Sequence, residues 1–136
     1  MLPDRHRLHR SADFRATTRG GRRVGRRDLV VHVTTRRAGD PSVAGPRVAR
    51  VGFVVSKAVG PAVTRHRVAR RLRHVCVPVV TALADDVDVV VRALPGAATA
   101  SSSELDRQLR SGLRRLGAFA ETPSAAPAPG RSPAAR

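Results

Sequence analysis

The residues of this chain that are best suited to chemistry are the cations gathered in its middle third. Residues 41–84 hold eight Lys and Arg side chains and no Asp or Glu. Nearly all of them are Arg, whose rigid, permanently charged guanidinium binds phosphate oxygens two at a time, which the Lys ammonium cannot do. A GC-rich genome also raises the proportion of Arg, but it does not explain the surplus of positive charge. The segment therefore predicts a site that binds phosphates.

The acidic residues offer no competing catalytic site. A two-metal nuclease needs carboxylates that converge on the scissile phosphate, and the basic segment contains none. Asp85, Asp86 and Asp88 are spaced like metal ligands, but a solvated turn followed by a strand edge is the better explanation. His6 and His9 are predicted to lie on a flexible arm. We therefore expect neither a catalytic residue nor a metal site in the protein itself.

The charge of the whole chain is strongly positive and unevenly distributed. The net charge is +16, from 26 Lys and Arg against 10 Asp and Glu. Residues 1–40 contribute +7 and residues 41–84 contribute +8, whereas residues 85–130 contribute −1. Such asymmetry indicates a binding face for a polyanion, and it excludes most small-molecule enzymes.

Cysteine content and hydropathy predict the compartment. A single cysteine, Cys76, excludes a disulfide within the chain and a cysteine-based zinc site. No stretch approaches the roughly 20 apolar residues that a membrane span requires, and the first residues lack the apolar core of a signal peptide. We expect a cytoplasmic protein with no membrane partner.

Hydrophobic periodicity and capping signals predict six elements that position these cations. They are a helix over residues 11–19, a strand over 29–35, a strand over 48–56, a helix from Thr64 onward, a strand over 87–94, and a helix that begins at the capping box of Ser101 and Glu104 and ends at Gly117. The order α-β-β-α-β-α predicts an α+β two-layer sandwich, in which apolar helix faces cover one side of a small sheet. Residues 1–120 are predicted to form one domain, and the Pro- and Ala-rich residues 121–136 a disordered tail.

The helix from Thr64 onward displays the basic segment. Its apolar positions recur on one side, at Val68, Leu72, Val75 and Val79. The cations fall on the other side, and no acidic residue is interleaved to neutralise them, as it would be on an ordinary solvated face. Arg65 lies near the apolar stripe, so we expect it to leave the first turn over the sheet edge. Pro78 interrupts the run, and we expect a kink or an early stop there.

The same residues resemble a known family. The resemblance is carried by the segments Gly52-Phe53-Val54-Val55-Ser56-Lys57, Val59-Gly60, Ala62-Val63-Thr64-Arg65-His66-Arg67 and Arg70-Arg71-Leu72-Arg73. In one continuous register over about residues 5–116, they are similar to the signature of the bacterial ribonuclease P protein component. Arg7-Leu8 and Asp13-Phe14, with a Gly near position 20, extend the similarity to the N-terminal part of the chain.

The resemblance implies a protein that assists a catalytic RNA in removing 5′ leaders from precursor tRNAs. The expected partners are the ribonuclease P RNA subunit and precursor tRNA, with no further protein required, and the expected cofactor is Mg²⁺, bound mainly by the RNA. The residues implied to bind the catalytic RNA are Arg65, His66, Arg67, Arg70, Arg71 and Arg73. Those implied to line a cleft for the leader are Phe14, Thr18, His32 and Lys57. The resemblance also implies a left-handed crossover through the basic helix, against the usual right-handed rule.

Departures from the family pattern change what the cleft is expected to do. His66 stands where the family has Asn in an Arg-Asn-Arg motif, and Pro61 stands where it usually has Asn. Thr18 and His32 stand where the family often has aromatic residues. Because base stacking contributes about 1–3 kcal/mol per aromatic contact, this cleft is expected to hold the leader more by charge than by stacking. We expect a solvent-accessible His32 imidazole, whose charged form a nearby phosphate favours.

Two other functions remain open at the level of sequence. A plain RNA-binding module, such as a ribosomal or assembly protein, would share the charge and the fold but show no turnover in any complex. A DNA-binding helix is the weaker alternative, because the basic helix has no Asn or Gln with which to read adenine.

Overall fold

All six predicted elements are present in the computed structural model, which describes residues 3–9, 11–36 and 48–120. They are α1 (Ser11–Gly20), β2 (Leu29–Thr35), β3 (Arg50–Val54), α2 (Ala62–Val80), β4 (Val87–Ala93) and α3 (Ser102–Arg115). The strand β3 is shorter than the strand predicted over residues 48–56. The predicted tail and residues 37–47 lie outside the described residues.

One strand and three short 3-10 helices were not predicted. The strand is β1 (Arg22–Gly25), whose sequence is mostly exposed and shows no apolar alternation. It forms because its backbone pairs antiparallel with β2, from Arg22 opposite Val33 to Gly25 opposite Val30. The 3-10 helices are η1 (Asp4–His6), η2 (Lys57–Val59) and η3 (Pro95–Ala98).

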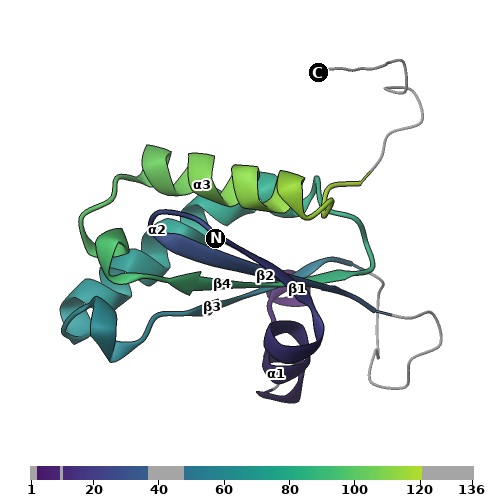
Figure 1. Ribbon diagram of the computed structural model, residues 1–136, viewed down its shortest axis with the longest axis horizontal. Coiled ribbons are helices and arrows are strands. Elements are labelled where there is room, and N and C mark those ends of the chain that lie inside the picture. Colours follow the sequence, from purple (N-terminus) through teal and green to yellow (C-terminus); the bar gives the residue numbers. More distant parts are fainter. Residues whose placement is uncertain (1–2, 10, 37–47, 121–136) are drawn as a thin grey trace.

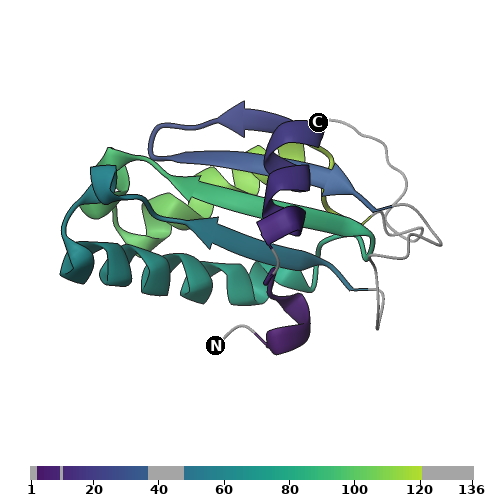
Figure 2. The ribbon, with the colours of Figure 1, turned by 90° about the horizontal axis from the view of Figure 1, so that it is seen from below.

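The strands form one mixed sheet in the order β1-β2-β4-β3. The strand β2 pairs antiparallel with β1 and β4, and β3 pairs parallel with β4. Parallel neighbours need a crossover connection, which α2 supplies. Figure 2 views the sheet from the α1 side: β3 and β4 both run to the left, β4 lies above β3, and α2 returns on the far side. This crossover is left-handed, as the family resemblance implied.

The helices α2 and α3 cover one face of the sheet and enclose the core (Figure 1). The stripe predicted on α2 is buried, since Val68, Leu72, Val75 and Val79 are at most 6% exposed. The core also contains Leu105, Leu109 and Leu113 of α3 and Val31, Val89 and Val91 of the central strands. Burial of each such side chain contributes about 1.5–3 kcal/mol to folding, so this layer is the stable frame of the molecule.

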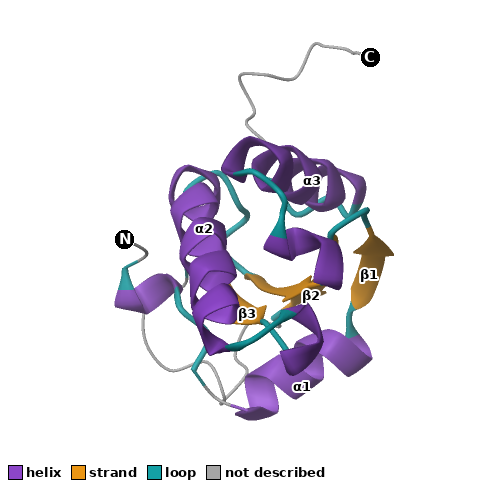
Figure 3. Cartoon of the chain, turned by 90° about the vertical axis from the view of Figure 1, so that its left-hand side faces the viewer, coloured by secondary structure: helices purple, strands orange, loops and turns teal. Residues whose placement is uncertain are grey.

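The helix α1 packs on the opposite face of the sheet, so the expectation that helices cover only one side is wrong. Figure 3 shows α1 below the strands and α3 above them. Thr17 is the buried residue of α1. Phe14 lies against Gly52 of β3, where a Cβ atom would overlap the aromatic ring. Glycine is therefore required at position 52 for this close approach.

Both ends of α3 follow their predicted signals, but the end of α2 does not. Ser101 and Glu104 form the predicted capping box, in which Glu104 N donates to Ser101 Oγ at 3.1 Å and Ser101 N donates to Glu104 Oε1 at 2.9 Å. Gly117, just beyond α3, adopts φ 68°, in the left-handed region. Pro78 does not stop α2, which continues to Val80. Among the described helices, none is long and apolar enough to cross a membrane.

Candidate nucleic-acid interface

The predicted cations of α2 lie on different sides of the helix. Arg67 and Arg70 are exposed and, with Val63 and His66, line a shallow depression on its outer side. Neither Arg forms an ion pair with an acidic residue in the described part of the chain. The first turn of α2 carries no acidic residue, and Pro61 at the N-cap provides no side-chain cap. The free N–H groups and the helix dipole therefore add to the positive potential of this side.

Arg65 and Arg73 lie on the other side of α2, beside a hollow of about 480 Å³. The hollow reaches from α2 across the edge of β3 to Phe14 of α1, and His66 lines it as well. Arg65 Nε donates to the Gly60 carbonyl at 3.2 Å, which directs this side chain away from the outer side. The hollow brings together Phe14, predicted for the leader cleft, with Arg65, His66 and Arg73, predicted to bind the catalytic RNA.

Arg71 is partly committed to the protein's own structure. Its Nη1 donates to the Ala100 carbonyl at 2.9 Å, and its side chain is half-buried. The bond ties α2 to the segment that leads into α3. Helical periodicity predicts that Arg71 is exposed like its neighbours. In the structure the segment that contains Ala100 lies beside it, and Arg71 is half-buried and bonded to that segment.

A second hollow lies between α1 and the sheet. Its lining residues are His9, Ser11, Phe14, Arg15, Thr18, Val54 and Arg92. Phe14 and Thr18 are brought together here, as predicted. Arg92 was not predicted, although it is an Arg in a run of Val and the exposed position of a strand whose other six residues are buried. The cleft thus contains one aromatic ring and the cations of Arg15 and Arg92. Lys57 is exposed on η2 and is not among these lining residues.

His32 does not expose its ring, so the prediction of a solvent-accessible, charged imidazole is wrong. The residue is 3% exposed, on the face of β2 that α1 covers, and neither ring nitrogen has a hydrogen-bond partner among the described residues. Burial is the main cause that lowers the pKa of His32, and the charges of Arg92 and Arg23 lower it further. The family resemblance placed His32 in one cleft with Phe14 and Thr18, but the close packing of α1 on β2, which buries the ring, has no local signal in the sequence.

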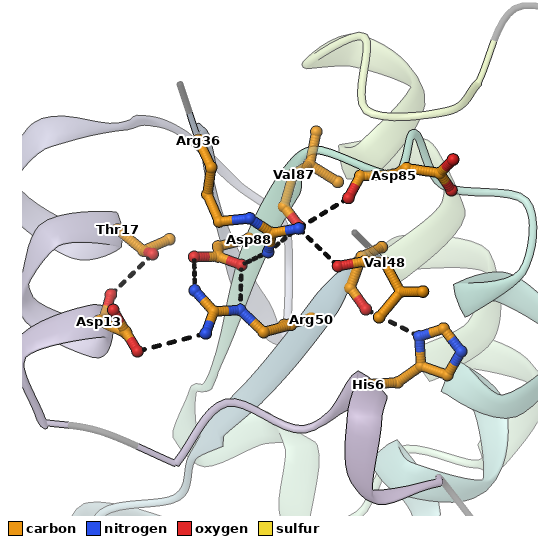
Figure 4. Close-up of polar contacts among 10 residues, drawn as sticks. His6, Asp13, Thr17, Arg36, Val48, Arg50, Asp85, Val87 and Asp88 are labelled. Carbon is orange, nitrogen blue, oxygen red and sulfur yellow. Dashed lines mark hydrogen bonds and ion pairs between the residues drawn. The ribbon is translucent and has the colours of Figure 1, made fainter. Parts of the chain in front are cut away.

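Asp88 is also buried, and the prediction that it lies on a solvated strand edge is wrong. It occupies the central strand β4, 3% exposed, where it pairs with Arg36 and with Arg50 (Figure 4). Arg50 donates to both carboxylate oxygens, from Nε at 2.9 Å and from Nη2 at 2.7 Å. The hydrogen bond with Asp88 is the main cause that raises the pKa of Arg50. A carboxylate enclosed by two guanidiniums is a structural ion pair and not a metal ligand.

The remaining acidic residues do not form a metal site in the described part of the chain. Residues 3–9, 11–36 and 48–120 contain no group of three or more His, Cys, Asp or Glu side chains arranged to hold a metal ion. The described cations and the Phe14 ring are groups suited to phosphates and bases. The outer side of α2 presents unpaired guanidiniums, and the cleft beside α1 presents one ring and two cations.

Comparison with known proteins decides the family. A family model described as ribonuclease P matches residues 2–117 of the chain. The chain belongs to the ribonuclease P protein family. Curated relatives named ribonuclease P protein component include one from Nocardia farcinica, 55% identical over 150 residues, covering 100% of this chain and 92% of that protein. Another, from Rhodococcus opacus, is 62% identical over 118 residues, covering 85% of this chain and 92% of that protein. The protein is thus a ribonuclease P protein subunit, part of a ribonuclease that processes tRNA.

Solved structures of the family share the fold. The RNase P protein from Staphylococcus aureus has a TM-score of 0.70 at 23% identity and covers 85% of this chain and 98% of that chain. The RNase P protein from Thermotoga maritima has a TM-score of 0.63 at 20% identity and covers 81% of this chain and 94% of that chain. At these identities the likeness concerns the arrangement of helices and strands.

Proposed function

We propose that the outer side of α2 binds the catalytic RNA subunit of ribonuclease P. The observation that carries this proposal is the pair Arg67 and Arg70, exposed at the N-terminal half of α2 and without an acidic partner among the described residues. Unpaired guanidiniums beside a helix N-terminus favour phosphate oxygens. A plain RNA-binding module could display the same face, so turnover in the assembled complex separates the two functions.

The cleft between α1 and the sheet is proposed to bind the single-stranded 5′ leader of precursor tRNA. Phe14 supplies a ring on which one base can stack, while Arg15 and Arg92 supply charge for the phosphates. Thr18 adds no ring, and His32 is covered. The leader is therefore proposed to be bound by stacking of one base on Phe14 and mainly by electrostatic attraction between its phosphates and the two Arg side chains.

The hydrolysis itself is proposed to belong to the RNA subunit, with Mg²⁺ held mainly by RNA in the cytoplasm. Two features of the described residues support this assignment: no carboxylate cluster has metal-ligand geometry, and Asp88 is committed to two Arg side chains. The protein then contributes binding energy and orientation. No further protein partner is needed for these roles.

Reconstitution tests the proposal. The protein is mixed with ribonuclease P RNA and precursor tRNA, and release of the 5′ leader is followed at low Mg²⁺. We expect leader removal by the two-component complex, weaker activity of the RNA alone, and none from the protein alone at any Mg²⁺ concentration. Cleavage by RNA-free protein after nuclease treatment contradicts the assignment of chemistry to the RNA. No stimulation of the RNA leaves the plain RNA-binding module as the better description.

A further inference from the structure

We infer that Arg50 is a positioning residue, which fixes α1 on the sheet and thereby sets the cleft for the leader without touching RNA itself. The inference rests on the proposed role of that cleft. Arg50 lies at the start of β3, pairs in register with Asp88 of β4, and reaches Asp13 of α1. It is the described side chain that forms ion pairs both with the sheet and with α1.

The helix α1 packs on the sheet through one side only, and Arg50 provides its described ion pair with a strand. Six of its 10 residues are exposed, and Thr17 is its buried residue. Thr17 directs its hydroxyl to the Asp13 carbonyl of the same helix, at 2.9 Å, so that group does not bond to the sheet. A helix of ten residues is marginal in water without tertiary contacts. At its first turn, Phe14 packs on Gly52 and Asp13 forms the ion pair with Arg50.

The ion pair is anchored on a buried carboxylate of the central strand β4. Asp88 accepts two hydrogen bonds from Arg50 and is also paired with Arg36 (Figure 4). Arg36 is fixed in turn, because its Nη2 donates to the carbonyls of Val48 at 2.6 Å and Asp85 at 2.7 Å. The guanidinium of Arg50 is thus held in plane by a bidentate bond. Its Nη1 remains, 3.4 Å from Asp13 Oδ2, to hold the helix.

The position of Asp13 bears directly on the cleft. Asp13 precedes Phe14, whose ring lines both hollows, the one beside α2 and the one beneath α1. A shift of the first turn of α1 therefore moves the ring that is proposed to stack on the leader. Arg50 itself is absent from the lining of both hollows, so its influence on the leader passes through α1.

Asp13→Asn is the most discriminating variant, because it removes a negative charge and so makes the net charge of the protein more positive. Electrostatics alone predicts tighter binding of any RNA, whereas loss of positioning predicts weaker binding of the leader. We expect the assembled enzyme to bind precursor tRNA roughly two- to tenfold more weakly, as for loss of a half-buried ion pair, and mature tRNA with unchanged affinity. Asp106→Asn is the matched control. It makes the same charge change on α3, where Asp106 pairs with Arg110 at 2.9 Å, and we expect no loss for either RNA.

A double-mutant cycle separates the ion pair from the helix dipole, which Asp13 also favours from the first turn of α1. Arg50→Gln leaves Asp88 paired with Arg36, so the sheet keeps its buried charge neutralised. We expect Arg50→Gln to weaken precursor binding as Asp13→Asn does, and the double variant to be no weaker than either one. Fully additive effects overturn the inference, as does an equal loss for precursor and mature tRNA, or tighter precursor binding by Asp13→Asn.

Hydrogen exchange of the free protein tests the positioning without RNA. We expect the backbone amides of α1 to exchange faster in Arg50→Gln, with those of α2 and α3 unchanged and the Arg110→Gln variant like the wild type. Unchanged exchange in α1 overturns the inference. If the wild-type enzyme binds precursor and mature tRNA equally, the proposed leader site fails, and the exchange measurement still decides whether Arg50 holds α1.

Discussion

At the scale of single residues, neighbouring Arg side chains of α2 differ in what they are free to bind. Arg67 and Arg70 have no partner of opposite charge in the described structure, whereas Arg71 donates to the Ala100 carbonyl and Arg65 to the Gly60 carbonyl. A guanidinium that already donates to a backbone carbonyl of the protein must break that hydrogen bond before it can bind an RNA phosphate, so it gains less free energy from RNA binding. The Arg side chains of α2 therefore differ in their availability for RNA binding, although helical periodicity alone predicts that they are equally available.

The first prediction concerns this inequality. The double variant Arg67→Ala, Arg70→Ala should weaken assembly with the RNA subunit and flatten its salt dependence, because each lost phosphate contact takes about 0.7–0.9 off the log-log slope. Arg71→Ala should change the slope less and instead lower protein stability by about 0.5–1.5 kcal/mol, the contribution of a typical hydrogen bond. Binding titrations at several salt concentrations, with thermal unfolding of each variant, measure both effects. Equal slopes for wild type and double variant would leave the outer side of α2 a solvated face.

A second prediction concerns His32. Its pKa in the folded protein is lowered mainly by burial, so the unfolded chain binds the proton more readily. Protonation of His32 therefore does not affect the free energy of unfolding above the unfolded pKa of about 6.5. Below that pH the unfolded state takes up the proton more readily, so the free energy of unfolding falls as the pH drops. Replacement His32→Phe removes the buried, unpartnered imidazole and should be at least as stable at pH 7. The stability difference between variant and wild type should widen from pH 7 to pH 5.5, as measured by urea unfolding at each pH. A constant difference would mean that the imidazole is as easily protonated when folded.

At the scale of elements, an open groove lies between α1 and the sheet. The helix α1 lines it with Ser11, Phe14, Arg15 and Thr18, and Arg92 of β4 also lines it. Phe14 and Thr18 are about one helical turn apart. A single-stranded chain has an unpaired base for the ring and phosphates for the cations, so this geometry favours it over a duplex.

The third prediction adds a ring to this groove. Thr18→Phe should tighten binding of precursor tRNA to the assembled enzyme by about 1–3 kcal/mol if the new ring stacks on a base. Mature tRNA lacks the leader and should bind as before. Thr81→Phe is a matched control, because Thr81 is exposed at the end of α2, away from the groove. Equal tightening for both RNAs would remove Thr18 from the leader site.

At the scale of the whole molecule, the left-handed crossover decides how the two proposed RNA surfaces lie relative to each other. Because α2 and α3 share one face of the sheet and α1 takes the other, the proposed surfaces flank the edge of β3 (Figure 3). The hollow lined by Phe14, Arg65 and Arg73 connects them at that edge. An RNA subunit bound on α2 and a leader bound beside α1 would thus both border this hollow.

The fourth prediction uses the cysteine chemistry of the chain. Cys76 is 2% exposed, and burial raises its pKa to about 12, so it should not react with maleimide in the folded protein. Ala69→Cys then places one reactive thiol in the shared hollow. Its labelling should slow when the RNA subunit is added and slow further with precursor tRNA but not mature tRNA. Ser103→Cys, exposed on α3, should label at the same rate throughout. Protection of both sites alike would indicate that RNA covers the protein without regard to this hollow.

The sequence by itself determined six of the elements, among them the basic helix. The stripe of α2, the capping box at Ser101 and the turn at Gly117 depend on residues within about three helical turns of each other, so the sequence alone predicts them. The unneutralised charge of residues 41–84 is likewise a property of composition. The family resemblance added the left-handed crossover, which periodicity cannot reveal.

Only the tertiary structure decided which polar residues are exposed. His32 is covered because α1 packs on β2, and Asp88 is neutralised because it pairs with Arg50 of β3 and with Arg36, which follows β2. Arg71 is partly occupied because the segment before α3 passes beside it. The strand β1 forms only because β2 offers it a partner. The physical reason is common to all four: burial and pairing are set by contacts between segments far apart in the chain, and such contacts leave no local pattern.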